Sequence, residues 1–301
     1  MNYAGRYTLL GSCFSENIGS WLAESQFQCV YNPMGISYNP VSIAQQLKLA
    51  LGLEDLDMER VQLSQGLWVH PDFHSSFFAS GREELQQVLE RAIAQCRQAL
   101  LDSEILFITF GSSIAFQSRS DLRVVNNCHK LPKAHFLQHK IDEAEAISAL
   151  GSVFEKLLQL RPHLEIYTTV SPVRHLRHGA IDNQRSKARL LRLCEMLCES
   201  MQRLQYIPVY EFVMDELRDY RFYRHDDLIH LNDAGLQALR ERLIQVLIDP
   251  AATETLRMVE RLQKMKQHRL LHPTSEAAQE FEVQKEALQK DVERMLQRPW
   301  R

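Results

Sequence analysis

The sequence predicts an α/β protein in which a parallel sheet lies between two layers of helices. Short apolar runs alternate with longer amphipathic segments along most of the chain, which is typical of repeated strand–helix–strand units. Five of the apolar runs have the length of strands. Because the crossover between two parallel strands is nearly always right-handed, this order favours an open three-layer α/β/α sheet.

The first half of the chain is predicted to hold three strands and three helices. In chain order these are a strand at 7–10, a helix from about residue 15, a strand at 27–31, helices at 40–51 and 82–101, and a strand at 105–110. Pro40 suits the first position of its helix, since the backbone N–H that proline lacks would find no partner there. Glycine-containing loops follow the three strands.

The second half of the chain is predicted to continue the alternation. It holds, in order, a helix at 142–160, a strand at 165–170, a helix at 183–203, a short strand at 206–209 and a helix from 232 to about 247. Ser171-Pro172 ends the longer of the two strands. Asn232 can cap the last helix, because its side chain can accept a hydrogen bond from a free backbone N–H.

The composition changes after Asp249-Pro250, and we predict a catalytic domain at 1–249 and a helical hairpin extension at 250–301. Apolar residues recur at helical spacing in two charged segments, and a turn at Pro273 separates the segments. The hairpin can pack on the parent domain, or it can act as a dimerisation arm. A homodimer through these C-terminal helices is therefore one of the expectations.

The composition excludes several classes of protein. Hydrophobic residues make up 45% and charged residues 24% of the 301 residues, unlike a disordered chain. The 35 basic residues are outnumbered by 38 acidic ones, which argues against a nucleic-acid partner. No apolar stretch is long enough for a membrane span, and the first residues do not resemble a signal peptide. We expect a cytoplasmic protein.

The cysteines and histidines do not form a strong metal-binding pattern. Six cysteines are spread along the chain without paired CxxC units, and this spacing is not that of a disulfide framework either. Cys194 and Cys198 lie one helical turn apart, but two ligands do not complete a metal site. Neither a metal nor another cofactor is expected.

Cys13 is a candidate nucleophile. In an open α/β sheet, ligands gather at the carboxyl ends of the strands, and Cys13 lies between the first predicted strand and the helix that follows it. The free N–H groups and the dipole at the start of a helix favour negative charge, so we expect a lowered pKa for this thiol. The same N–H groups can hold the oxyanion of an acyl-transfer intermediate. The alternative is a small residue that merely fills a tight turn.

Asp227 and His230 form a candidate pair for proton transfer. They precede the last predicted helix of the domain, and the three-residue offset lets the carboxylate accept from one imidazole nitrogen. The other nitrogen is then free to exchange a proton with a nucleophile or leaving group. A DxxH motif alone is weak, but its place at the far end of a domain that opens with a candidate nucleophile strengthens it.

Several motifs resemble those of one family. Residues 10–17 (LGSCFSEN) look like the motif that names the GSCFA family, with Ser15 in the usual alanine position. Residues 127–132 (NCHKLP) resemble a second signature of that family, and SPVRH at 171–175 with NQRSK at 183–187 resembles a third. With Asp227 and His230, the resemblance covers roughly residues 5–250.

The GSCFA family is similar to the SGNH/GDSL hydrolases, and this resemblance implies a flavodoxin-like sheet and Ser-His-Asp ester chemistry. Transferred to this sequence, the nucleophile falls on Cys13, while Ser12 stands where the superfamily has aspartate. Asp227 and His230 match without change. Ser12 remains an alternative nucleophile, with Cys13 then only packing.

The resemblance also implies donors for an oxyanion. These are the backbone N–H near Cys13 and the glycine that falls on Gly35. A third donor, an asparagine side chain, is missing from the matching stretch at 111–114. In other enzymes, one such donor stabilises the transition state by about 2.7–4 kcal/mol. Ser113, or a polar side chain from the 127–129 loop, is the candidate replacement.

Three further polar residues are candidates for substrate binding. Asn127 and His129 follow an apolar run and can either enter the site or brace their own loop. Arg174 can hold a substrate carboxylate or phosphate, or form a structural salt bridge. Asp72, His74 and Ser75 are close in sequence only, and we interpret them as a solvated loop.

These observations predict an SGNH-like hydrolase that cleaves an acyl ester or thioester of a small molecule or glycan. One alternative is an acyltransferase that passes the acyl group from the same acyl-enzyme to an amine or hydroxyl. Another is a catalytically silent binding or assembly module, which the missing asparagine favours and the intact Asp227-x-x-His230 opposes.

Overall fold

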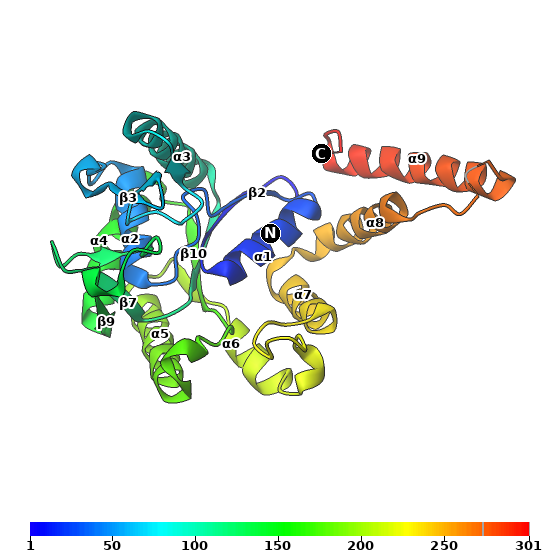
Figure 1. Ribbon diagram of the computed structural model, residues 1–301. Coiled ribbons are helices and arrows are strands. Elements are labelled where there is room, and N and C mark those ends of the chain that lie inside the picture. Colours follow the sequence, from blue (N-terminus) through cyan, green and yellow to red (C-terminus); the bar gives the residue numbers. More distant parts are fainter. Residues whose placement is uncertain (273, 301) are drawn as a thin grey trace.

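The protein is described by a computed structural model over residues 1–272 and 274–300. Its centre is a parallel sheet of five strands in the order β2-β1-β6-β10-β11 (Figure 1). The strands are β1 (Arg6–Gly11), β2 (Gln28–Tyr31), β6 (Ile105–Phe110), β10 (Glu165–Val170) and β11 (Leu204–Tyr206). Counted along the chain, this is the order 2-1-3-4-5 of flavodoxin-like folds. The predicted three-layer α/β/α class is confirmed.

Helices cover both faces of the sheet (Figure 1). One face carries α1 (Cys13–Glu24) and α7 (Asp233–Leu247). The opposite face carries α2 (Pro40–Leu51), α3 (Arg82–Asp102), α4 (Glu143–Leu160) and α5 (Ala180–Ser200). A short helix α6 (Val209–Glu211) leads into a π-helical turn (Phe212–Glu216), and three-residue 3-10 turns stand at Met58–Arg60, Lys133–His135, Leu176–His178 and Tyr220–Phe222.

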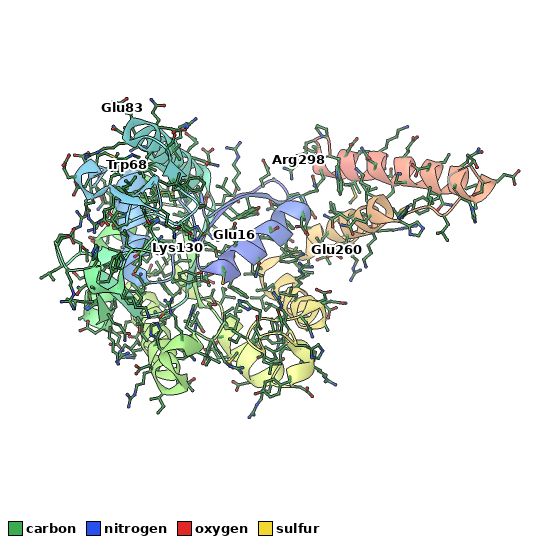
Figure 2. The ribbon with its side chains drawn as sticks, in the orientation of Figure 1. Glu16, Trp68, Glu83, Lys130, Glu260 and Arg298 are labelled. Carbon is green, nitrogen blue, oxygen red and sulfur yellow. The ribbon has the colours of Figure 1, made fainter. Side chains whose placement is uncertain are left out.

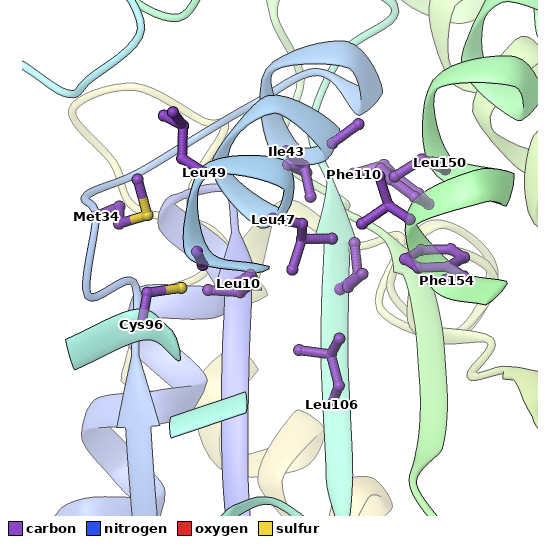
Figure 3. Close-up of a cluster of buried hydrophobic side chains, with 14 of the residues drawn as sticks. Leu10, Met34, Ile43, Leu47, Leu49, Cys96, Leu106, Phe110, Leu150 and Phe154 are labelled. Atoms are coloured by element: carbon purple, nitrogen blue, oxygen red, sulfur yellow. The ribbon is translucent and has the colours of Figure 1, made fainter. Parts of the chain in front are cut away.

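Side-chain alternation along the strands explains why helices are needed on both faces. In β6, Leu106 and Ile108 pack with Ile43 and Leu47 of α2, whereas Phe107 packs into the core on the α1 side. Successive residues of a strand point to opposite faces, so a strand that is apolar throughout must be covered twice. Figure 3 shows the α2 side of this core, with Leu10, Leu106 and Phe110 beneath α2 and α4.

The predicted elements agree with the structure except near some ends. The segments 40–51, 105–110 and 165–170 match α2, β6 and β10, and Asn232 caps α7 by accepting from the Gly235 N–H at 3.0 Å. The last strand lies at 204–206 instead of 206–209, because Pro208 has no N–H for the sheet. The first helix begins at Cys13 rather than near Ser15, so the candidate nucleophile belongs to it.

Two small antiparallel sheets lie outside the predicted pattern. One consists of β3 (Gln62–Ser64), β4 (Leu67–Val69) and β5 (Phe78–Ala79). The other consists of β7 (Ile114–Ser118), β8 (Val124–Val125) and β9 (Phe136–Lys140). Their strands have two to five residues, which is too short to produce a clear alternation in the sequence.

The C-terminal helices are α8 (Pro250–Gln267) and α9 (Glu276–Leu296), and α9 returns along α8 (Figure 1). Leu256 of α8 is buried in the same core as α1 and α7, while Val259 of α8 and Val292 of α9 belong to a separate small cluster. Pro273, where a turn is predicted, lies outside the described residues. Over the described ranges, no helix combines the length and apolar character that crossing a bilayer requires.

Candidate active site

The candidate site lies at the carboxyl ends of β1 and β6, where the strand order reverses. Gly11 ends β1 with a φ of +131°, and a Cβ there would lie 2.2 Å from the Thr109 carbonyl oxygen of β6. Only glycine therefore permits this close approach of the two strand ends. The Gly11 N–H donates to the Asn32 side chain at 2.9 Å. The Asn32 amide in turn donates to Glu16 of α1 at 2.7 Å, and Figure 2 labels Glu16 on that helix.

Cys13 is the first residue of α1 and is half-buried. Burial raises the pKa of its thiol, while the Phe14 N–H and the nearby Lys187 act in the opposite direction. The prediction of a lowered pKa is therefore wrong, because desolvation raises the pKa by more than the N–H groups at the start of the helix lower it. The helix N-terminus and the cation remain as the features that stabilise the thiolate.

Ser12, the alternative nucleophile, is closed off from solvent. It is fully buried, and its N–H donates to the Thr109 carbonyl oxygen at 3.2 Å. Its hydroxyl has no hydrogen-bond partner among the described residues. The half-buried Cys13 is thus more accessible than Ser12.

Asp227 and His230 form a preorganised pair. The second carboxylate oxygen of Asp227 lies 2.8 Å from His230 Nδ1, and the first accepts the N–H groups of Ile229 and His230 at 2.8 and 2.9 Å. These bonds hold the pKa of Asp227 well below its usual range. Leu228 allows the tight turn by adopting a left-handed φ of +55°. The carboxylate thus holds the imidazole through Nδ1, and Nε2 takes no part in this contact.

A groove of about 770 Å³ lies on the His230 side of the site. His230 lines it together with Phe14, the neighbour of Cys13, and Pro172 from the loop after β10. Ile18 and Trp21 of α1 continue its wall. Such a volume is that of a small-molecule pocket.

His175 links the surroundings of Cys13 to those of His230. Burial and the charges of Lys187 and His230, among others, lower the pKa of His175 to about 4, so its imidazole is neutral near pH 7. Its ring packs edge-on against Tyr38 at 5.6 Å, and burial, followed by the charge of Cys13, raises the pKa of Tyr38. Within the described residues, no hydrogen bond joins Cys13 directly to His230.

The two other expected oxyanion donors are already engaged. The Gly35 N–H donates to the Asn32 carbonyl oxygen at 2.8 Å. The Ser113 N–H donates to Ser186 Oγ at 2.7 Å, and its hydroxyl lies 3.2 Å from the same atom. The prediction that Gly35 and Ser113 donate to an oxyanion therefore conflicts with these hydrogen bonds. The start of α1 at Cys13 is left as the candidate oxyanion site.

Comparison with known families gives the same assignment as the sequence motifs. The model of the GSCFA family matches residues 6–243, which spans the sheet and the site. The chain belongs to the GSCFA family. None of the curated proteins matches the sequence significantly.

One solved structure similar to this GSCFA chain is a protein from Streptococcus pneumonia that is provisionally described as a platelet activating factor. The identity is 13% and the TM-score is 0.41, with 81% of this chain and 83% of that one covered.

Asn127 and His129 brace their loop. Asn127 accepts the His129 N–H at 2.8 Å and donates its own N–H to the Pro71 carbonyl oxygen at 3.1 Å. His129 is buried, and its Nε2 lies 2.8 Å from the His70 carbonyl oxygen. Of the two interpretations of this loop, the structural one fits these contacts.

Arg174 lies beside the loop that carries His230. Its guanidinium stacks over the Tyr223 ring at 5.3 Å, and Tyr223 pairs with Leu231 at the base of that loop. Over the described part of the chain Arg174 forms no salt bridge, so the structural alternative for it is not observed. Its charge stays available to an anionic ligand.

Sequence reasoning missed Lys187 as a site residue of this GSCFA chain. Lys187 is 1% exposed, and its ammonium donates to the carbonyl oxygens of Gly111 and Ser171, both at 2.6 Å. A lysine in a charged helix normally faces solvent. The signal that could have indicated its burial is helical spacing, which places Lys187 on the same helix face as Asn183, Ser186 and the apolar Leu190.

No group of three or more His, Cys, Asp or Glu side chains that could hold a metal ion occurs within 1–272 and 274–300.

Arg60 and Asp72 form a buried ion pair away from the candidate site, and Asp121 also binds Arg60 at 2.9 Å. Asp72 is therefore part of a structural network and not of a solvated loop.

Proposed function

We propose that this protein is an SGNH-like hydrolase that cleaves an acyl ester or thioester through an acyl-enzyme on Cys13. The single observation that carries the proposal is the Asp227–His230 pair, with 2.8 Å between carboxylate and Nδ1, at a groove that is also lined by Phe14, the residue after Cys13. A carboxylate that orients an imidazole next to a nucleophile is the arrangement of acyl-transfer sites. The sequence resemblance to SGNH hydrolases supports the same assignment.

In the proposed reaction, the Cys13 thiolate attacks the acyl carbonyl and forms a tetrahedral intermediate. The Cys13 N–H at the start of α1 donates to the oxyanion. The C–O or C–S bond of the substrate then breaks, and His230 gives its proton to the departing alcohol or thiol. In the second half, His230 takes a proton from water, and the resulting hydroxide attacks the thioester. The bond to the Cys13 sulfur breaks and releases the acid and the thiolate, and His230 keeps the proton that it gives to the next leaving group.

The groove favours a substrate with an apolar acyl portion. Phe14, Ile18 and Trp21 form one wall, and Leu236 of α7 contributes to the other. Burial of apolar surface provides about 25 cal/mol per Å² toward binding. In this proposal the alcohol side of the substrate, a small molecule or a glycan, lies near His230 and the solvent.

Acyl transfer is the second candidate, and the thiol nucleophile favours it. A thioester reacts readily with amines relative to its reaction with water, so an amine acceptor can compete for the acyl-enzyme. Transfer would keep every residue in the same role and replace water with the acceptor. Adding candidate amines and alcohols distinguishes the two: hydrolysis releases free acid, and transfer converts the acceptor into product.

The proposal is tested with turnover of a panel of activated acyl esters. Cys13→Ala and His230→Ala are expected to abolish turnover while the circular dichroism spectrum stays that of the wild type. Cys29→Ala and His225→Ala are the matched controls, because Cys29 is also half-buried and His225 lines the same groove. Full activity of a folded Cys13→Ala variant would contradict the assignment and favour a binding module.

A further inference from the structure

Lys187 is a buried cation near the candidate site. It lies in the second turn of α5, its side chain is almost completely buried, and its ammonium reaches the ends of β6 and β10. There it donates to the carbonyl oxygens of Gly111 and Ser171, at 2.6 Å each. A buried lysine is rare unless a partner compensates the lost hydration of its charge.

The hydrogen bonds of Lys187 do not supply a negative charge. Both acceptors are neutral backbone carbonyls, and among the described residues no carboxylate forms a salt bridge with Lys187. Burial lowers the pKa of its ammonium to about 7, and the charge of Cys13 is the influence that raises it. The thiolate of Cys13 is thus the available counter-charge.

The backbone places the two groups together independently of their titration. Gly111, whose carbonyl holds the ammonium, packs against Ser12: a Cβ on Gly111 would lie 3.2 Å from the Ser12 Cβ. The Ser12 N–H is bonded to the strand end at Thr109, and Cys13 is the next residue. Cys13 and the backbone that holds the ammonium are therefore neighbours at the ends of β1 and β6.

We propose that Lys187 is the positioning residue that holds the Cys13 thiolate as an ammonium–thiolate pair. The S–H bond of Cys13 breaks and its proton passes to the neutral amine of Lys187, so that R–SH plus R–NH2 gives R–S⁻ plus R–NH3⁺. The net charge of the buried site does not change in this transfer, and the two charges formed compensate each other. This role deepens the proposed function, on which it rests, and it leaves His230 for the leaving group and for water.

Four titratable groups face Cys13 or Lys187 from the surrounding elements. Glu16 of α1 disfavours the thiolate, and Lys187 of α5 favours it. Tyr38, in the loop after β2, and His175, in the loop after β10, respond to these charges and stay neutral near pH 7. Lys187 is consequently the cation through which Cys13 can be activated.

Cys29 shows what the same burial does without a cation. It is also half-buried, and desolvation raises the pKa of its thiol to about 12. Its thiol donates to the Gly19 carbonyl oxygen at 3.5 Å, and no cation is among the causes of its pKa shift. Cys29 therefore serves as an internal reference for Cys13 in the same molecule.

The test is the pH profile of iodoacetamide alkylation at each cysteine, followed by peptide mass spectrometry on the full chain. Lys187→Met is expected to move the Cys13 midpoint upward by at least about one pH unit, with about tenfold slower alkylation near pH 7. Lys187→Arg should restore a low midpoint, since arginine keeps the charge. Cys29 should be unchanged. Lys140→Met is the matched control, because Lys140 is exposed and pairs with Asp182 of α5.

An unchanged Cys13 profile in folded Lys187→Met overturns the proposal. If that variant does not fold, the thiolate absorbance of the wild type minus Cys13→Ala decides: a midpoint well below about 12 supports the pair, and one at the Cys29 value contradicts it. Neither measurement needs turnover. If the measurements show no ammonium–thiolate pair, the hydrolase proposal is unaffected. If the pair is found but no acyl-enzyme forms, only the hydrolase proposal is overturned.

Discussion

Asp227 is the residue whose contacts are most completely defined in the site. Its two carboxylate oxygens accept from two backbone N–H groups and face His230 Nδ1. These bonds keep the carboxylate ionised throughout the neutral range, because they favour its charged form. An ionised Asp227 fixes the tautomer of His230 with Nε2 free, which the proposed proton transfers require.

Asp227→Asn is therefore expected to reduce ester turnover by about 10²–10⁴-fold while stability changes little. The amide can keep part of the turn but cannot hold the imidazole in the same tautomer. Asp226→Asn is the matched control, since Asp226 is the neighbouring carboxylate and pairs with Arg224 at the surface. Equal activity of both variants in a steady-state assay would remove Asp227 from the mechanism.

At the scale of elements, the cap of α7 supports the loop that carries the pair. Asn232 accepts the Gly235 N–H, and its amide donates to the carbonyl oxygens of Arg221 and Tyr223, at 2.7 and 3.1 Å. The same side chain thus starts the helix and closes the base of the His230 loop. Asn39 caps α2 by accepting from Ser42 at 2.8 Å, but α2 carries no site residue.

Asn232→Ala and Asn39→Ala are both expected to lower the free energy of unfolding by about 0.5–2 kcal/mol, the usual effect of losing a cap. Only Asn232→Ala should also slow turnover, because it loosens the His230 loop. Denaturant unfolding and the ester assay, run on both variants, test this. A comparable loss of turnover in Asn39→Ala would mean that stability, and not the loop, controls activity.

The sequence allows the main elements to be predicted because their signals are local. Pro40 and Asn232 mark helix starts, and the apolar run at 105–110 marks a strand that is buried on both faces. The role of Lys187 could not be predicted in this way. Its partners, Gly111 and Ser171, are 76 and 16 residues away, and only the packing of α5 over two strand ends brings them together.

The engaged donors illustrate the same limit. Nothing local in the sequence indicates that Ser186 will take the Ser113 N–H, or that the Gly35 N–H will close its own turn. Both depend on how loops from separate strands settle against one another. The hydrogen bonds of the folded chain decide which atoms remain free.

At the scale of the whole molecule, the 2-1-3-4-5 strand order explains why distant segments form one site. The loops after β1, β2, β6 and β10 all leave the sheet at its carboxyl edge, where ligands bind in such folds. The chain then crosses to α7 and brings Asp227 and His230 beside α1. Phe14, which follows Cys13 near the start of the chain, and His230, near the end of the domain, consequently line the same groove.

The central claim is that Cys13 forms a His230-dependent acyl-enzyme. The most direct measurement is peptide-mapping mass spectrometry after brief exposure to an activated acyl ester, with His230→Ala and His225→Ala run in parallel. We predict a rapid acyl adduct on Cys13 in the wild type and in His225→Ala, and its loss in His230→Ala. An adduct on Ser12 would reverse the choice of nucleophile, and the absence of any His230-dependent adduct at either residue would contradict the account.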